Sequence, residues 1–238
     1  MLSAVLWGGL AAASLLVGYA LAGRGLSNRT IGIVMGFGAG ALLSAIAYEL
    51  VPESALGGGR MGIAFLLGAL TFFGADWWID HRGGSDRKDI AGKQVGSGSA
   101  IFVGTLLDNV PESIILGMSV ALGGVINLAF LVAVFISNLP EGLAGTANLE
   151  AAGRSRRTIF WMWSAVVIIS AACAGLGYLV VHWLPGADGR IAQAFAAGAM
   201  LTMLADAMMP EAFEHGGKLV GLVTVLGFLT AAILAVMG

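Results

Sequence analysis

Eight apolar stretches, separated by short polar segments, follow one another along the 238-residue chain. Each is close to the roughly 20 residues that an α-helix needs to cross the hydrocarbon core of a bilayer. Open sheets leave backbone groups that lipid cannot satisfy, so we expect helices. The expected spans are residues 2–22, 31–52, 61–79, 99–121, 126–147, 159–183, 191–213 and 219–237. The pattern predicts an all-α integral membrane protein with eight transmembrane helices in a single domain, residues 1–238.

The composition supports a membrane location. Hydrophobic residues make up 58% of the sequence and charged residues only 11%, whereas soluble domains usually carry about 25% charged residues. The formal net charge of −2 argues against a nucleic-acid partner. The lone Cys173 excludes an internal disulfide and a cysteine metal cluster. No basic residue precedes the first span, so we interpret Met1 to Ala22 as a retained helix rather than a signal peptide.

The 12 lysines and arginines are distributed unevenly between the loops. Only Arg60 and Arg190 fall in even-numbered loops, and the others fall in odd-numbered loops. Loops rich in lysine and arginine face the cytoplasm. We therefore expect the odd loops, including a cytoplasmic loop at about 81–97, to lie inside. Both termini are then expected outside a multi-pass protein of the cell (inner or plasma) membrane.

The sequence contains an internal repeat. "FGAGALLSAIAYELVPE" (37–53) matches "FAAGAMLTMLADAMMPE" (195–211) at eight of seventeen positions, and "GIAFLLGALT" (62–71) aligns with "GLVTVLGFLT" (221–230). Helices 1–3 are therefore predicted to repeat as helices 6–8 around helices 4 and 5, a 3+2+3 arrangement. The second span is expected to run outward and the seventh inward, so the repeat is inverted, as in many membrane transport proteins.

Two polar motifs interrupt the fourth and fifth spans. "LLDNVPESIILG" (106–117) and "FISNLPEGLAG" (135–145) share the pattern Asn-x-Pro-Glu. Residues four apart lie on one helix face, which pairs Asp108 with Glu112 and Ser137 with Glu141, with Asn109 and Asn138 at the edge of the same faces. Pro111 and Pro140 cannot donate to the carbonyls four residues earlier. Both motifs therefore predict a polar, distorted helix segment inside the bundle.

The acidic residues of these motifs need a positive partner. A carboxylate at the bilayer centre costs roughly 2.5–3.5 kcal/mol on the insertion scale. Every lysine, arginine and histidine is expected in a loop or at a helix end, so an internal ion pair is not available. The compensating cation is therefore expected from outside the sequence, as a metal ion or a proton.

Further polar residues lie towards the ends of the second and seventh spans. They either reach to water at the membrane surface or form an outer and an inner relay for a passing cation, and the sequence leaves both interpretations open. They are Glu49, Glu53, Asp206, Glu211, Glu214 and His215. Asp76 and Asp80, beside Trp77 and Trp78, are expected in an interfacial belt.

The paired "DNVPES" and "SNLPEG" motifs, the eight spans and the inverted repeat resemble the ZIP family of metal transporters along essentially the whole chain. The resemblance implies transport of divalent metal ions, uptake through a binuclear site between helices 4 and 5, and often a homodimer in the lipid membrane. By motif position, one metal would meet Asp108, Glu112, Ser137 and Glu141. The other would meet Asn109, Glu112, Asn138 and Glu141. The implied cargo is Zn²⁺, Fe²⁺ or Mn²⁺, with no resident cofactor.

The chain also departs from that family. Many members have histidine at the position of Asp108 and histidine or glutamine at that of Ser137. An all-oxygen ligand shell suits harder ions such as Mn²⁺ better than a histidine-rich zinc site does. A proton-coupled carrier of another solute could use the same acids and stays an alternative. No H-E-x-x-H motif occurs, so we expect no metalloenzyme activity.

Overall fold

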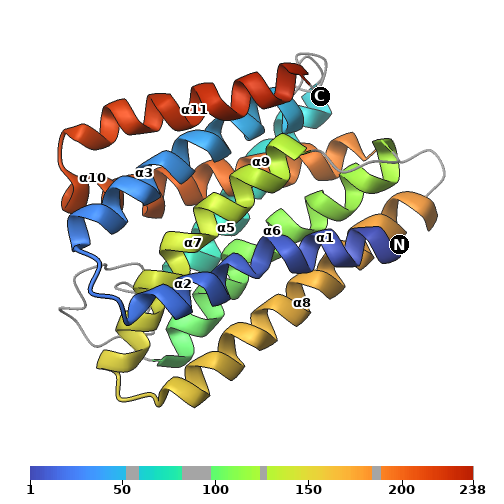
Figure 1. Ribbon diagram of the computed structural model, residues 1–238. Helices are drawn as coiled ribbons and strands as arrows, with labels where there is room; N and C mark the ends of the chain where they lie inside the picture. Colours follow the sequence, from blue (N-terminus) through green and yellow to red (C-terminus); the bar gives the residue numbers. More distant parts are fainter. Residues whose placement is uncertain (52–58, 82–97, 124–127, 184–188, 238) are drawn as a thin grey trace.

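A computed structural model describes residues 1–51, 59–81, 98–123, 128–183 and 189–237. Of the residues in these ranges 93% are helical, and none of them is in a strand. The helices are α1 (Leu2–Ala12), α2 (Ser14–Ala22), α3 (Asn28–Ala45), η1 (Ile46–Leu50), α5 (Gly59–Ile79), α6 (Gly98–Gly123), α7 (Leu128–Ala151), α8 (Arg156–Trp183), α9 (Arg190–Met203), η3 (Leu204–Met208), α10 (Met209–Gly216) and α11 (Leu219–Met237). Figure 1 shows them as an elongated bundle.

Eight helices in the described ranges are long and apolar enough to cross a membrane, which confirms the expected number and type of spans. The first span, Leu2–Ala22, consists of α1 and α2. Its division coincides with Ser14, whose hydroxyl donates a hydrogen bond to the carbonyl of Ala11 at 2.7 Å. Such local bonding by serine competes with regular helix bonding. The chain is a multi-pass membrane protein by the length and apolarity of these helices.

Two spans contain a five-residue π-helical segment that the sequence did not predict. One is η1, Ile46–Leu50, at the end of α3, and the other is η3, Leu204–Met208, between α9 and α10. In the sequence repeat, Ile46 aligns with Leu204 and Leu50 with Met208. The two segments therefore occupy the same aligned positions. Short π-helical turns widen a helix locally and are frequent at functional sites.

Close glycine contacts join several pairs of helices, and two of these contacts are related by the repeat. A methyl group on Gly68 of α5 would overlap the backbone carbonyl of Phe195 on α9, and one on Gly227 of α11 would overlap that of Phe37 on α3. Small residues allow membrane helices to approach this closely. Gly68 aligns with Gly227 and Phe195 with Phe37 in the repeat, so the two contacts are equivalent in sequence.

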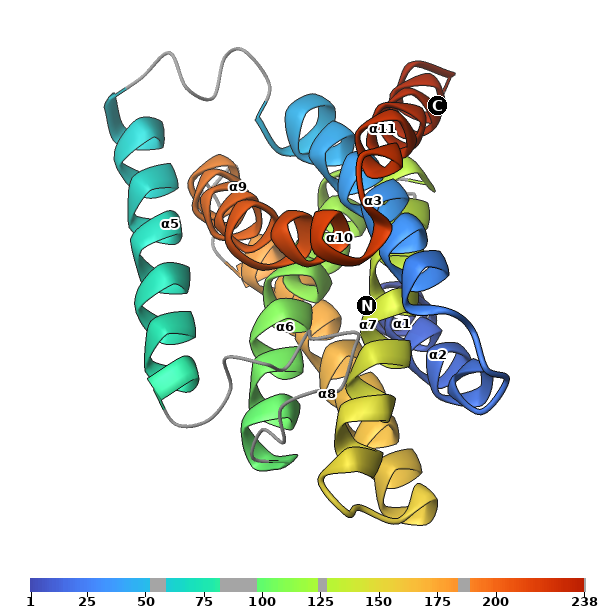
Figure 2. The same ribbon diagram turned by 90° about the vertical axis from the view of Figure 1, so that its left-hand side faces the viewer.

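The helices that carry the polar motifs are among the most buried. In the apolar window of each span, 67% of the residues are buried in Leu128–Ala151 and 61% in Ile101–Leu122, whereas 17% are buried in Leu219–Met237. Figure 2 shows α5 at the edge of the bundle beside α9, with α6 and α7 farther in. The outer helices expose leucine and valine, as Leu222 and Val225 of α11 do. This distribution is that of a bundle whose outer surface meets lipid.

Both termini lie at one end of the bundle. The connections from α2 to α3, from α7 to α8 and from α10 to α11 lie at the opposite end (Figure 1). These connections carry Arg24, Arg154 and Lys218. The expected cytoplasmic loop at 81–97 lies outside the described residues except for His81, which is exposed.

Candidate functional site

The two polar motifs lie on neighbouring buried helices. Asp108, Asn109 and Glu112 of α6 each expose 1% of their surface, and Ser137 and Asn138 of α7 expose 2%. Glu141 of α7 is partly buried. Burial of this many polar side chains on two facing helices is unusual for a membrane protein and indicates a function.

A direct hydrogen bond joins the motifs. Asn138 donates from Nδ2 to Oδ1 of Asn109 over 3.0 Å, and Asn109 donates from its own Nδ2 to the carbonyl of Thr105 at 3.0 Å. These two bonds orient the Asn109 amide, because its nitrogen is directed along α6 and its oxygen towards α7. An amide oxygen has two lone pairs, so Asn109 Oδ1 can accept from Asn138 and still ligate a cation.

Ser137 is placed by close packing against α3. Its hydroxyl donates to the carbonyl of Val134 at 2.9 Å. A methyl group on Gly38 of α3 would lie 2.8 Å from the Ser137 Cα, so only glycine allows this approach. With its proton committed to the helix backbone, the serine oxygen presents lone pairs to its surroundings.

Pro111 and Pro140 lie inside continuous helices, α6 and α7. The carbonyls of Leu107 and Ile136 therefore cannot receive the usual bonds from residues 111 and 140. The helices continue through both prolines, so the motif residues stay in helical register. Asp108 and Glu112 therefore share one face of α6, and Ser137 and Glu141 share one face of α7, as the spacing predicts.

The charge around these motifs is negative. No lysine, arginine or histidine is among the buried residues of the part of the chain that the structure describes. Asp108 and Glu112 are buried acids, and Glu141 is partly so. A low-dielectric interior strengthens the attraction of such carboxylates for a cation.

The acids of the two motifs are not gathered at one point. Within the described ranges, the one set of three acidic or histidine side chains with ligand atoms all within 4.8 Å of one another is Glu211, Glu214 and His215. Asp108, Glu112 and Glu141 do not meet that condition together. The amide pair is joined by a direct hydrogen bond between α6 and α7.

The remaining candidate residues are spread over the second and seventh spans. Glu49 is half-buried on η1, and Asp206 is exposed on η3. Glu211 and His215 of α10 lie one helical turn apart, with 3.0 Å between His215 Nδ1 and Glu211 Oε1. Glu53 lies outside the described residues.

One buried acid escaped the sequence prediction. Trp77 and Trp78 are 55% and 50% exposed, as expected for an interfacial belt, but Asp76 is only 5% exposed. Asp76 is therefore buried against protein, unlike the two tryptophans beside it. Gly68, Phe72 and Asp76 recur every four residues on the buried face of α5, and this helical period is the signal that could have identified it.

Comparison with known proteins leaves the family open. No family model matches this chain, and no curated protein matches it. The inference on function therefore rests on the residues of the chain and their geometry.

Proposed function

We propose that this protein transports divalent transition-metal ions across the cell membrane, as the resemblance to the ZIP family implies. Zn²⁺ is the first candidate cargo, with Fe²⁺ and Mn²⁺ as the others, and the direction is uptake into the cytoplasm. The observation that carries the proposal is the buried α6–α7 constellation, in which the acids lie on the same two helices as an amide pair joined by the Asn138–Asn109 bond. Intramembrane acids of this kind mark ion pathways.

The donors suit a cation of intermediate or hard character. The six motif residues offer carboxylate, amide and hydroxyl oxygens, with no thiolate or imidazole among them. In the proposed binuclear site, Glu112 and Glu141 bridge the ions, which also contact Asp108, Asn109, Ser137 and Asn138. A divalent ion would draw the carboxylates towards the amide pair, since glutamate can rotate about several side-chain bonds.

The 3+2+3 inverted repeat is part of the proposal. Three observations support it: the sequence match, the two π-helical segments at aligned positions, and the equivalent contacts of Gly68 and Gly227. Such repeats place the binding site of a transporter near the bilayer midplane, between the two halves. Here α6 and α7 would occupy that position.

We further propose that both termini face outward and that Glu211 with His215 forms the inner relay, with Glu53 at the outer mouth. The excess of lysine and arginine in odd loops supports this orientation. Single cysteines in a Cys173→Ser background can test it with a membrane-impermeant thiol reagent. A cysteine at Arg154 should react only after the membrane is opened, and one at Leu2, which is 71% exposed, should react in intact cells. The reverse pattern would refute the orientation.

Uptake into proteoliposomes tests the function. The parent protein should accumulate at least one of Zn²⁺, Mn²⁺, Fe²⁺ and Cd²⁺, and Glu112→Gln and Glu141→Gln should each reduce uptake by about tenfold or more, since each removes a proposed bridging carboxylate. Glu150→Gln is a matched control, because Glu150 lies on α7 in an exposed ion pair with Arg156. Uptake by both variants at the parent rate would refute the mechanism.

The alternative is a proton-coupled carrier of another solute that uses the same acids. The two functions differ in what stabilises the protein. Metal binding to the folded state raises thermal stability by mass action. A thermal-unfolding midpoint that rises with Zn²⁺ or Mn²⁺ in the parent, and not in Glu112→Gln, favours metal transport, whereas no response to any of these metals favours the proton-coupled carrier.

A further inference from the structure

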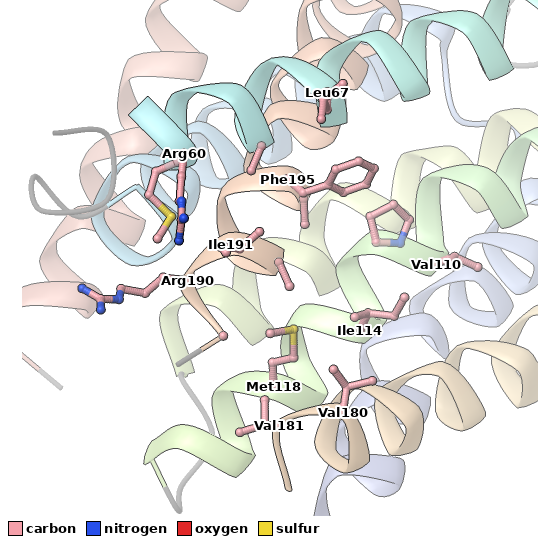
Figure 3. Close-up of a pocket in the computed structure, with 16 residues that line it drawn as sticks. Arg60, Leu67, Val110, Ile114, Met118, Val180, Val181, Arg190, Ile191 and Phe195 are labelled. Atoms are coloured by element: carbon pink, nitrogen blue, oxygen red, sulfur yellow. The ribbon is translucent and has the colours of Figure 1, made fainter. Parts of the chain in front are cut away.

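An apolar groove of about 930 Å³ runs between α5 and α9 on one side and α6 and α8 on the other. Its lining includes Leu67 of α5, Ile114 of α6, Val180 of α8 and Phe195 of α9 (Figure 3). Leu67, Val180 and Phe195 are 52%, 43% and 39% exposed. These residues belong to helices that can span a membrane, so the groove is open towards lipid.

One end of the groove is basic. Arg60 and Arg190 are the only charged residues among those lining it in the described part of the chain. Each lies at the beginning of its helix, α5 or α9, and both are exposed. Figure 3 shows both arginines at the same end, with Val110 and Phe195 farther along the groove. Two positively charged side chains therefore lie at the end of the apolar groove that opens to the membrane surface.

The dimensions fit a lipid chain. The seven residue steps from Arg60 to Leu67 correspond to a helix rise of about 10 Å. One leaflet of a hydrocarbon core about 30 Å thick is about 15 Å deep. If the charged group of a lipid lies at the arginines, the part of its apolar chain that lies in the groove therefore stays within one leaflet for most of the groove's length.

We propose that this groove binds an anionic glycerophospholipid. Its phosphate lies between Arg60 and Arg190, and one acyl chain lies between the α5–α9 pair and the α6–α8 pair. Arginine binds phosphate through several parallel N–H donors, so two arginines at the end of an apolar groove suit an anionic head group. The apolar lining excludes a water-soluble anion as the occupant of the full groove, because such an ion would leave most of it unfilled.

The proposed lipid would contact the helix that carries the candidate metal residues. Pro111, Ile114 and Met118 of α6 line the groove, while Asp108 and Glu112 of the same helix are buried in the bundle. An acyl chain in this position fills the space between α6 and α9. This lipid site does not depend on metal transport, so each proposal can fail without the other.

Native mass spectrometry of the purified full chain with added dioleoyl phosphatidylglycerol or dioleoyl phosphatidylcholine tests the proposal. The parent should bind one phosphatidylglycerol more tightly than phosphatidylcholine. Arg60→Gln with Arg190→Gln should weaken phosphatidylglycerol binding by about tenfold and phosphatidylcholine binding by less, because the choline charge offsets part of the attraction between its phosphate and the arginines. The matched control is Arg24→Gln with Arg29→Gln, two exposed arginines outside the groove, which should bind like the parent.

A second variant tests the apolar part. Ala192 lines the groove on α9, and Ala192→Phe should reduce binding of both lipids by filling the slot. A phosphatidylglycerol with a photoreactive acyl chain should label peptides of α6 or α9 in the parent and lose that labelling in Ala192→Phe. The proposal is overturned if the double arginine variant binds phosphatidylglycerol like the parent, if Ala192→Phe retains the labelling, or if inorganic phosphate displaces the lipid completely.

Discussion

Asn138 of α7 donates a 3.0 Å hydrogen bond to Oδ1 of Asn109 on α6, and both side chains are buried. The two residues hold the same place in motifs separated by 29 positions. The bond connects the two halves of the candidate site directly. It also fixes the rotation of α6 against α7 at this depth, because a buried amide has few alternative partners.

Asn138→Ala should destabilise the protein by about 1–3 kcal/mol, since it leaves the buried Asn109 oxygen without its donor from α7. The reverse change, Asn109→Ala, should have a similar effect. Thermal or chemical unfolding in detergent measures both. The double variant serves as the control, because it should be less destabilised than the sum of the single variants by about 1 kcal/mol. Strict additivity would show that the bond contributes nothing.

Asp108→His should shift metal preference from Mn²⁺ towards Zn²⁺, because imidazole is a better ligand for zinc than for harder ions. Competition between the two ions during uptake measures the preference. The control is Glu150→His, at an exposed acid of α7 that is in an ion pair with Arg156, and it should leave the ratio unchanged. An equal ratio in Asp108→His and the parent would remove Asp108 from the proposed ligand set.

Metal affinity should fall as the pH is lowered. The proposed ligands bind metal as carboxylates, so protons compete for the same oxygens, and the affinity is highest where they are fully deprotonated. Metal binding should release protons at mildly acidic pH. Calorimetry in two buffers of different ionisation enthalpy measures that release. Affinity that rises on acidification, or binding without proton release anywhere in this range, contradicts carboxylate ligation.

Gly68→Ala and Gly227→Ala should each destabilise the protein by about 1–3 kcal/mol, because the new methyl group meets a backbone carbonyl of the neighbouring helix. Gly62→Ala and Gly74→Ala are matched controls on α5, where an added methyl meets nothing within 4 Å. These controls should be neutral or slightly stabilising, since alanine favours helix. Unfolding midpoints in detergent compare the four variants. Equal stability of Gly68→Ala and Gly74→Ala would contradict the close α5–α9 contact.

The number of spans, their helical type and the location of the polar motifs were predictable from the sequence. Hydrophobic length is a local property, so each apolar stretch predicts a helix whatever its neighbours are. An even number of spans also predicts both termini at one end, which the structure shows. The burial of Asp108 and Glu112 followed from their position in the middle of apolar spans.

Other features depend on how the helices are rotated and packed, and only the tertiary structure decided them. The contact between Asn138 and Asn109, the separation of the three motif acids and the groove below Arg60 and Arg190 all belong to this class. The burial of Asp76 belongs to this class as well. The sequence shows the four-residue spacing of Gly68, Phe72 and Asp76, but it does not specify which face of α5 points inward. Apolar residues surround a membrane helix on every side, so hydrophobicity alone does not determine which face meets protein and which meets lipid. That choice is made by close packing at residues such as Gly38 and Gly68, where the absence of a side chain allows two backbones to touch.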